Sequence, residues 1–345
     1  MRVKREHLTL LFNRLFDRGD ARFSISHPCE AIGDLVRVEL DEPESSSVRF
    51  EVDRDGYAVA RNEAVLRHGD TIETDLPAPD DYRNAIVASG IVEPVNIDAL
   101  STFLTRYGDP DLMAGHAPVF AGFDTNLLPW RIDRILGLRD PESGVGYVNG
   151  FALATGVRDE LDWDVKCHDT DPFVDAYGPA AEAYWNQPIG SGRISRLGLT
   201  AYREIRDIQQ AAELASDRGD EAIIGAYADW QDDVRGQVIL FSNDRGFVER
   251  ARANTILSHV VELPTDWPTT MRASWRELEL LVYLLTVVFG IVELPGVTLH
   301  GVWRGKEGVD WQEERVKLDA RSPPLRDALE GDLSIVESYE ELRQR

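Results

Sequence analysis

The middle of the chain alternates short apolar runs with stretches in which apolar residues recur at helical spacing. The runs 119–123, 147–154, 238–242 and 258–263 have the length and apolar content of buried strands, and the stretches 199–214 and 246–253 have the spacing of helices. Strands that alternate with helices are typical of a largely parallel sheet covered by helices. Residues 117–264 are therefore predicted to form an α/β domain with a central parallel sheet, in which residues 162–198 are an irregular insertion.

The two ends of the chain carry different patterns. The first 80 residues predict a helix at 4–17, then strands at 22–26, 35–40, 48–52 and 57–60, with Asp-Arg-Asp-Gly at 53–56 as a hairpin turn. The last 81 residues predict a helix at 272–289, strands at 297–304 and 311–318, and an acidic helix at 325–345.

These patterns divide the chain into four predicted parts. They are an N-terminal α+β module (1–80), a helical connector (81–116), the parallel-sheet domain (117–264) and a C-terminal α+β extension made of helix and hairpin (265–345). The predicted fold class is therefore α/β, with smaller α+β parts on either side of the central domain.

The charge of the 345-residue chain is unusual, because its formal net value is −24. Basic residues are almost all arginine, and lysine occurs only at Lys4, Lys166, Lys306 and Lys317. Concentrated salt screens the self-repulsion of an acidic surface, so this composition indicates a halophilic archaeal source. We expect a cytoplasmic protein without a membrane span, since the longest apolar run, 280–292, is too short and the N-terminus lacks an apolar signal core.

Four acidic residues stand at junctions between the predicted elements of the middle region. Asp124 and Asp244 follow the strands at 119–123 and 238–242, whereas Glu160 and Asp220 lie at helix starts. Two carboxylates about 4 Å apart repel by roughly 4 kcal/mol at an effective dielectric near 20, so a shared pocket needs protons or a cation. Hard oxygen ligands suit Mg²⁺ or Mn²⁺, the ions of phosphodiester hydrolysis. The alternative is that these acids simply cap helices and strand ends.

Four segments that contain these acids resemble the motifs of PIN-domain ribonucleases. They are Phe-Asp-Thr-Asn-Leu at 123–127, Ala-Thr-Gly-Val-Arg-Asp-Glu-Leu at 154–161, Gly-Asp-Glu-Ala-Ile-Ile-Gly-Ala-Tyr at 219–227 and Leu-Phe-Ser-Asn-Asp-Arg-Gly-Phe-Val at 240–248. The order of all four and their places at element junctions agree with that family. The resemblance covers roughly residues 117–263 and leaves the flanking parts without an assignment.

The resemblance implies a metal-dependent endoribonuclease, a hydrolase with a parallel sheet and RNA as its substrate. Carried over residue by residue, the ligands of Mg²⁺ or Mn²⁺ would be Asp124, Glu160, Asp220 and Asp244, and the residues that orient them would be Asn126 and Ser242. Two positions have alternatives. Glu204 could replace Glu160 as the second acid, because the segment between Glu160 and Asp220 is long, and Asp217 or Glu221 could replace or supplement Asp220.

A net-basic patch inside the acidic chain is predicted to contact RNA. It consists of Arg193, Arg196, Arg203 and Arg206, with Tyr184, Trp185 and Tyr202 nearby in the sequence. Arginine forks on phosphates and aromatic stacking on bases suit single-stranded RNA. The alternative is a solvated helix face on which Arg203 and Arg206 pair with Glu204 and Asp207.

Two other functions compete with the ribonuclease. One is an RNA-binding or regulatory protein of the same fold that no longer cleaves. The other is a phosphatase with Asp124 as its nucleophile, which is disfavoured because position 126 is Asn and offers no general acid. Homo-oligomers are compatible with the chain, whereas a toxin–antitoxin partner is disfavoured because the toxins that resemble this segment are near-minimal single domains.

Overall fold

The computed structural model describes residues 1–108, 110–140, 143–162 and 165–343 and divides into two compact units. Unit 1 contains Met1–Val92, Val165–Arg193 and Thr265–Arg345, and unit 2 contains Glu93–Asp164 and Ile194–Pro264. This division differs from the four predicted parts, because the two ends of the chain and most of the predicted insertion belong to one unit. No helix of the described ranges is long and apolar enough to span a bilayer.

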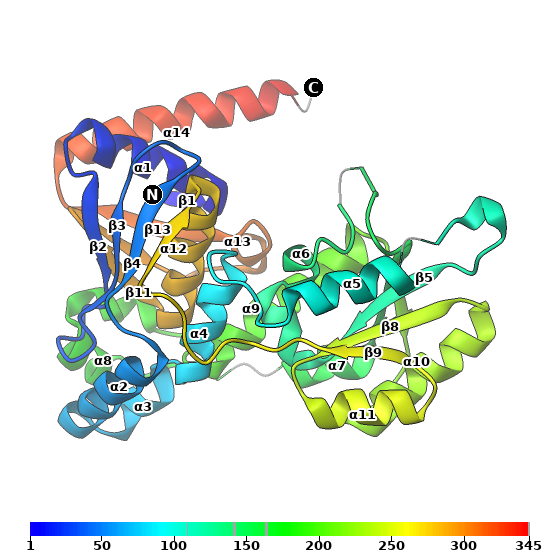
Figure 1. The fold of residues 1–345 in the computed structure, drawn as a ribbon. Helices are drawn as coiled ribbons and strands as arrows, with labels where there is room; N and C mark the ends of the chain where they lie inside the picture. The colour runs from blue at the N-terminus through cyan, green and yellow to red at the C-terminus, as the bar shows by residue number, and fades with distance from the viewer. Residues whose placement is uncertain (109, 141–142, 163–164, 344–345) are drawn as a thin grey trace. The chain divides into compact units, whose positions relative to one another are not determined.

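Unit 1 is built on an eight-stranded antiparallel sheet (Figure 1). In spatial order its strands are β1 (Arg2–Lys4), β13 (Arg315–Ala320), β12 (Val297–His300), β11 (Ile291–Leu294), β2 (Arg22–Ser26), β3 (Asp34–Glu39), β4 (Ser46–Phe50) and β10 (Thr270–Ala273). Strands from the two chain ends pair directly, with Val3 opposite Val316 and Val48 opposite Met271. The sheet needs strands from both the N-terminal and the C-terminal part of the chain, so these two parts belong to one unit.

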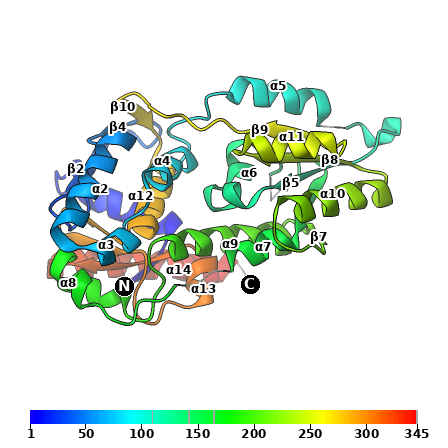
Figure 2. The ribbon, with the colours of Figure 1, turned by 90° about the horizontal axis from the view of Figure 1, so that it is seen from below.

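One apolar helix, α12 (Trp275–Phe289), is buried almost all round, because α4, α1 and strands of the sheet pack against it. A capping box starts α12, because Ser274 Oγ accepts from the backbone of Glu277 and the Glu277 carboxylate accepts from the backbone of Ser274. Figure 2 shows α4 beside α12. The other elements are η1 (Arg5–His7), α1 (Leu8–Asp17), α2 (Arg54–His68), α3 (Asp70–Asp75), α4 (Pro79–Ala88), α8 (Asp171–Tyr177), η4 (Pro179–Tyr184), α13 (Gly308–Gln312) and α14 (Pro323–Arg343).

Two predicted elements of unit 1 are wrong. Residues 57–60 lie in α2 and are not a strand, because the Asp53 carboxylate accepts from the Gly56 N–H at 2.7 Å and caps a helix instead of closing a hairpin turn. The predicted strand 311–318 is a helix end followed by β13, since α13 continues to Gln312. The acidic C-terminal helix is confirmed as α14.

Unit 2 contains the predicted parallel sheet, which is confirmed. Its spatial order is β7 (Ala212–Leu214), β6 (Gly150–Ala154), β5 (Val119–Phe123), β8 (Gln237–Ser242) and β9 (Leu257–Val260), and every pairing is parallel. The chain runs outward from β5 through β6 to β7 and then returns to β8 on the other side of β5. The carboxyl ends of β5 and β8 therefore form a topological switch point, the usual place for a ligand site in an open α/β sheet.

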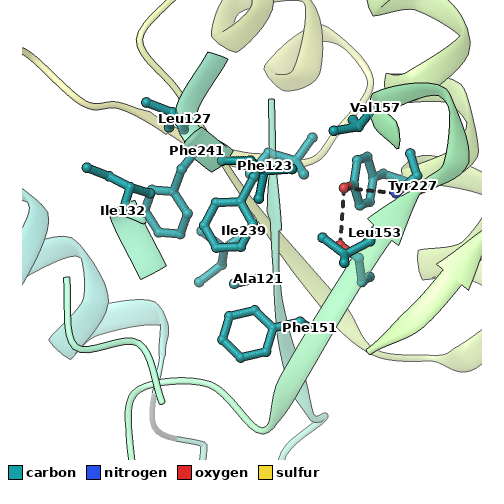
Figure 3. Close-up of a cluster of buried hydrophobic side chains, with 14 of the residues drawn as sticks. Ala121, Phe123, Leu127, Ile132, Phe151, Leu153, Val157, Tyr227, Ile239 and Phe241 are labelled. Carbon is teal, nitrogen blue, oxygen red and sulfur yellow. Dashed lines mark hydrogen bonds between the residues drawn. The ribbon is translucent and has the colours of Figure 1, made fainter. Parts of the chain in front are cut away.

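Aliphatic side chains and several aromatic rings fill the core of this sheet (Figure 3). The Phe123 ring stacks between those of Phe151 and Phe241, with centroids 6.0 and 6.2 Å apart. Gly122 is required here, because a β-carbon would lie 2.6 Å from the Tyr227 ring of α10 (Asp220–Val234). Burial of each large apolar side chain stabilises the unit by roughly 1.5–3 kcal/mol, which fixes the strand ends relative to α10.

The remaining elements of unit 2 connect these strands. They are α5 (Ile97–Tyr107), η2 (Leu112–Ala114), η3 (Thr125–Trp130), α6 (Ile132–Ile135), α7 (Thr155–Leu161) and α11 (Arg245–Ala253). The helix α9 (Ser191–Asp207) begins in the part of the chain assigned to unit 1 and continues in unit 2. It ends earlier than the predicted helix 199–214, because residues 212–214 form β7.

Candidate functional site

Asp124 is the central residue of the candidate site. It follows β5 directly, its backbone N–H donates to the Phe241 carbonyl at 3.0 Å, and its side chain is buried with the residue 5% exposed. Two neutral donors hold the same carboxylate oxygen: Ser242 Oγ donates to Oδ2 at 2.6 Å and Asn126 Nδ2 donates to it at 3.3 Å. Within the described ranges no basic side chain forms an ion pair with Asp124.

The electrostatics of Asp124 follow from this environment. Burial raises the pKa of the Asp124 carboxyl, the hydrogen bond from Ser242 lowers it, and the negative charge of Asp220 raises it again. The net direction is upward. A carboxylate that is buried, held by neutral donors and repelled by a second acid would be stabilised in its charged form by a cation.

Asp244 is connected to Asp124 through Ser242. The Asp244 N–H donates to Ser242 Oγ at 2.8 Å, so this hydroxyl accepts from one acid's backbone and donates to the other acid's side chain. The Asp244 carboxylate caps α11, because its Oδ1 accepts from the Gly246 N–H at 2.7 Å. Asp244 is exposed. It caps a helix, which is the alternative role that the sequence left open for these acids.

Glu160 joins the segment after β5 to the start of α10. One of its oxygens accepts from Thr125 Oγ1 and the other accepts from the Gly219 N–H at 2.9 Å. Gly219 has a φ of 94°, a conformation that favours glycine, and it places Asp220 at the first position of α10. Asp220 forms an ion pair with Arg250 of α11, and its side chain is 41% exposed.

The negative charge of Asp220 thus acts on Asp124, and Asp244 is linked to Asp124 through Ser242. Glu160 is bonded to Thr125 and Gly219, the residues next to Asp124 and Asp220. In the part of the chain that the structure describes, the four carboxylates do not form a group whose ligand atoms all lie within 4.8 Å of one another. The group that meets this criterion is Glu6, His7 and Glu340 in unit 1, where the Lys4 ammonium already lies 2.7 Å from Glu340.

The donor set fits a divalent cation of a particular kind. Mg²⁺ commonly takes one or two protein carboxylates and completes its shell with water and substrate phosphates. Asp124 and Asp220 are the two carboxylates that could contribute to such a site, although Asp220 is already paired with Arg250. An open cavity of about 630 Å³ lies at Asp220, lined by residues 217–222 and Arg250, and Asp124 is not among its lining residues.

The alternatives for the second and third acids have different surroundings. Glu204 accepts from Arg131 at 2.6 and 2.9 Å and from Arg134 at 2.9 and 3.0 Å. Burial alone would raise the pKa of Glu204, but the two guanidinium groups outweigh it and lower the pKa to about 2. Glu204 therefore stays ionised, and its negative charge is compensated by Arg131 and Arg134. Asp217 and Glu221 line the same cavity as Asp220 but are exposed.

The arginine patch predicted to contact RNA does not form one surface. Arg193 is completely buried in unit 1, with its Nη1 2.5 Å from the Asp75 carboxylate, so its prediction as an RNA contact is wrong. Arg206 pairs with Asp207 at 2.7 Å, which is the solvated-face alternative. Tyr184 and Tyr202 are buried and present no face for a base. Arg196 and Arg203 are partly exposed on α9.

One residue at the site, Arg250, was absent from the predicted set. It lies on α11, the helix that Asp244 caps, and it reaches Asp220 at the start of α10. No local pattern signals this pairing, because the partners are 30 residues apart in the chain. The pairing puts a positive charge on the acid that would share a metal ion with Asp124.

Comparison of the chain with protein-family models, with curated proteins and with solved structures gives no match. The features that point to a function are the geometry of unit 2 and the motif resemblance of residues 117–263.

Proposed function

We propose that unit 2 is a metal-dependent ribonuclease of the PIN type, which hydrolyses phosphodiester bonds of RNA. The observation that carries the proposal is Asp124, a buried carboxylate at the switch point of a parallel sheet, held by neutral donors and repelled by Asp220. Asp124 and Asp220 would hold Mg²⁺ or Mn²⁺. When bound, the ion would supply an activated water and charge stabilisation for the phosphate oxygens.

The surrounding residues would act by holding these two carboxylates in place. Ser242 and Asn126 fix the orientation of the Asp124 carboxylate through their hydrogen bonds to Oδ2. Glu160 fixes the turn at Gly219 that presents Asp220, and Asp244 fixes the start of α11. In this proposal Glu160 and Asp244 are positioning residues. The resemblance would also allow them to bind the ion through water.

The substrate assignment to RNA comes from the motif resemblance and is supported by one feature of α9. Arg196 and Arg203 are partly exposed on that helix and would contact phosphates of the RNA backbone. The charge of the Arg203 guanidinium would attract a polyanion over a short range in high salt, although the chain as a whole carries −24.

The test is cleavage of a mixed pool of end-labelled RNAs in high salt, with Mn²⁺ or with EDTA. Wild type is compared with Asp124→Asn and with Asp232→Asn, which makes the same chemical change at an exposed position of α10. We expect wild type and Asp232→Asn to cleave with Mn²⁺, no cleavage in EDTA, and none by Asp124→Asn. Cleavage by Asp124→Asn at the wild-type rate would refute the proposal.

A second function, RNA binding without cleavage, is favoured by the ion pair between Arg250 and Asp220. A guanidinium at this acid would supply the positive charge that a metal ion otherwise provides. Filter binding of the same RNA pool distinguishes the two functions. RNA that is retained but remains intact with Mn²⁺, equally by wild type and Asp124→Asn, would establish the binding function.

A further inference from the structure

A cavity in unit 1 has the properties of a second ligand site. Its volume is about 720 Å³, and its floor is formed by β1, β13 and β12. Arg2 is opposite Lys317, Lys317 is opposite His300, and Asp319 is opposite Thr298, so these residues share one face of the antiparallel sheet. The intervening residues, such as Val3, Val316 and Leu299, are buried on the other face.

The walls of the cavity come from two other segments. Pro179 and Glu182 belong to η4, and Arg304 follows β12. The Arg304 guanidinium lies over the Trp185 ring, 4.6 Å from its centroid, and is held there by a cation–π contact. Arg304 is exposed, and no ion pair joins it to a carboxylate in the described ranges, so its charge is available to a ligand.

The charge of this cavity is opposite in sign to that of the whole chain. Three basic side chains line it, Arg2, Arg304 and Lys317, against two acidic ones, Asp319 and Glu182. The side chains of the lining sum to +1, whereas the chain carries −24, and Arg2 is also paired with Asp310 at 3.7 Å. Lys317 is itself 3.0 Å from Asp319, which leaves Arg304 as the principal site for an anionic group.

His300 lines the cavity from β12 and contacts one of its acids. Its Nε2 is 3.0 Å from the Asp319 carboxylate, and its Nδ1 has no partner among the residues that the structure describes. Burial lowers the pKa of His300 to about 4, although Asp319 opposes this effect, so the ring is neutral at pH 7. Because Nδ1 is itself buried, the acceptors that a ligand can reach are the carboxylates of Glu182, which is exposed, and Asp319, whose side chain is 45% exposed.

We infer that this cavity binds a small organic phosphate ester that carries free hydroxyl groups. Arg304 takes the phosphate, with Lys317 beside Asp319 as a second positive charge, and the Glu182 or Asp319 carboxylate accepts from a ligand hydroxyl. A bare phosphate ion would fill a small part of 720 Å³, a volume in the range of sites that bind molecules as large as a nucleotide or a sugar phosphate. This site is separate in its residues from the carboxylates of unit 2.

Isothermal titration calorimetry of the full chain in high salt tests the inference. The probes are ribose 5-phosphate, adenosine 5′-monophosphate, adenosine and inorganic phosphate. We expect one of the two esters to bind about tenfold or more tightly than adenosine and phosphate, since each of these lacks one of the two polar anchors. Preference between the two esters identifies the ligand as a sugar phosphate or a nucleotide.

Variants locate the binding. Arg304→Gln and Lys317→Gln are expected to weaken ester binding by about tenfold each, and Arg276→Gln, an exposed arginine of α12 outside the cavity, is expected to leave it unchanged. Asp124→Asn separates this site from unit 2 and is expected to have no effect. Absence of binding by both esters, or equal binding by wild type, Arg304→Gln and Lys317→Gln, would overturn the inference.

Discussion

Two buried aspartates, one in each unit, differ in the charge of the groups that surround their carboxylates. Asp75 in unit 1 is 0% exposed and lies 2.5 Å from the Arg193 guanidinium, which is also 0% exposed. The same guanidinium donates to the backbone carbonyls of Asp75 and Val288. Its charge and its donors are thereby satisfied inside the protein, as a buried ion pair requires.

Asp124 in unit 2 is almost as buried but receives hydrogen bonds from neutral donors, Ser242 and Asn126. Burial raises the pKa of both aspartates. At Asp75 the charge of Arg193 opposes this effect, whereas at Asp124 the charge of Asp220 adds to it. The difference shows that the chain supplies a guanidinium where a buried carboxylate is structural. At Asp124 no basic side chain of the described residues has this role, and we propose that a cation from solution does.

The largest effect is expected at the structural pair. Arg193→Met leaves the Asp75 carboxylate buried and unpaired, which should lower the free energy of unfolding by about 3–5 kcal/mol. Urea denaturation in high salt measures this loss. The double variant Asp75→Leu/Arg193→Met removes both charges and should recover most of it. A single variant as stable as wild type would show that Asp75 does not depend on Arg193.

The next effect concerns Glu204, whose side chain is 19% exposed. Glu204→Gln removes its ion pairs with Arg131 and Arg134 but leaves Arg131 with Asp133, so we expect a loss of about 2 kcal/mol at pH 7. If Glu204 were instead a metal ligand, the variant would weaken Mn²⁺ binding and leave unfolding unchanged.

The same residue predicts a pH dependence. The pKa of Glu204 is lowered from 4.5 to about 2, so its stabilisation is complete above pH 4.5 and disappears as the pH falls toward the folded-state value. The stability difference between wild type and Glu204→Gln should therefore shrink below pH 4.5. Asp207→Asn is the control, because Asp207 is exposed on the same helix and its pair with Arg206 should contribute less than about 1 kcal/mol.

The contrast between the two aspartates also separates what the sequence could predict from what it could not. Asp124 is signalled locally, since an apolar strand run followed by an acid predicts a carboxylate at the edge of a parallel sheet. Ser242 is signalled in the same way by its own strand. The two residues are 118 positions apart, but each can be predicted from its own segment of the sequence alone.

Arg193 is also 118 positions from its partner, Asp75, and neither residue belongs to a pattern that marks it as buried. A charged residue in a polar segment is indistinguishable from a surface residue until the tertiary structure is known. For the same reason the sequence missed the pair of Arg250 and Asp220 and the eight-stranded sheet, whose strands come from opposite ends of the chain.

A smaller effect on stability is expected at Asp124 itself. Asp124→Asn keeps the shape and removes the buried charge, so the free energy of unfolding at pH 7 should change by less than about 1 kcal/mol or increase. The pKa of Asp124 in the folded protein is raised above 3.8. The protonated carboxyl therefore contributes fully to the free energy of unfolding below pH 3.8, and this contribution is lost as the pH rises through the folded-state pKa. The variant should therefore gain stability relative to wild type over that rise.

Divalent ions sharpen this test. Mn²⁺ at about 100 times its dissociation constant stabilises a protein that binds it in the folded state by roughly 2.7 kcal/mol. We expect wild type to show such a shift in thermal unfolding and Asp124→Asn to show none. Asp232→Asn serves as the control, and equal shifts in all three proteins would place the bound Mn²⁺ away from Asp124.

The smallest change in stability is expected for Arg250→Ala, because an exposed ion pair contributes less than about 1 kcal/mol. Its effect on Mn²⁺ affinity should be larger, since the guanidinium competes with a metal ion for the Asp220 carboxylate. Arg245→Ala is the matched control, because Arg245 lies on the same helix, is exposed, and pairs with Glu262 at 2.8 Å. If Arg250→Ala tightens Mn²⁺ binding and Arg245→Ala does not, Arg250 is a competitor that substrate or metal displaces. Equal Mn²⁺ affinity in both variants would mean that Asp220 takes no part in metal binding. Asp124 would then lose the partner on which the ribonuclease proposal depends, and RNA binding without cleavage would be the better account of unit 2.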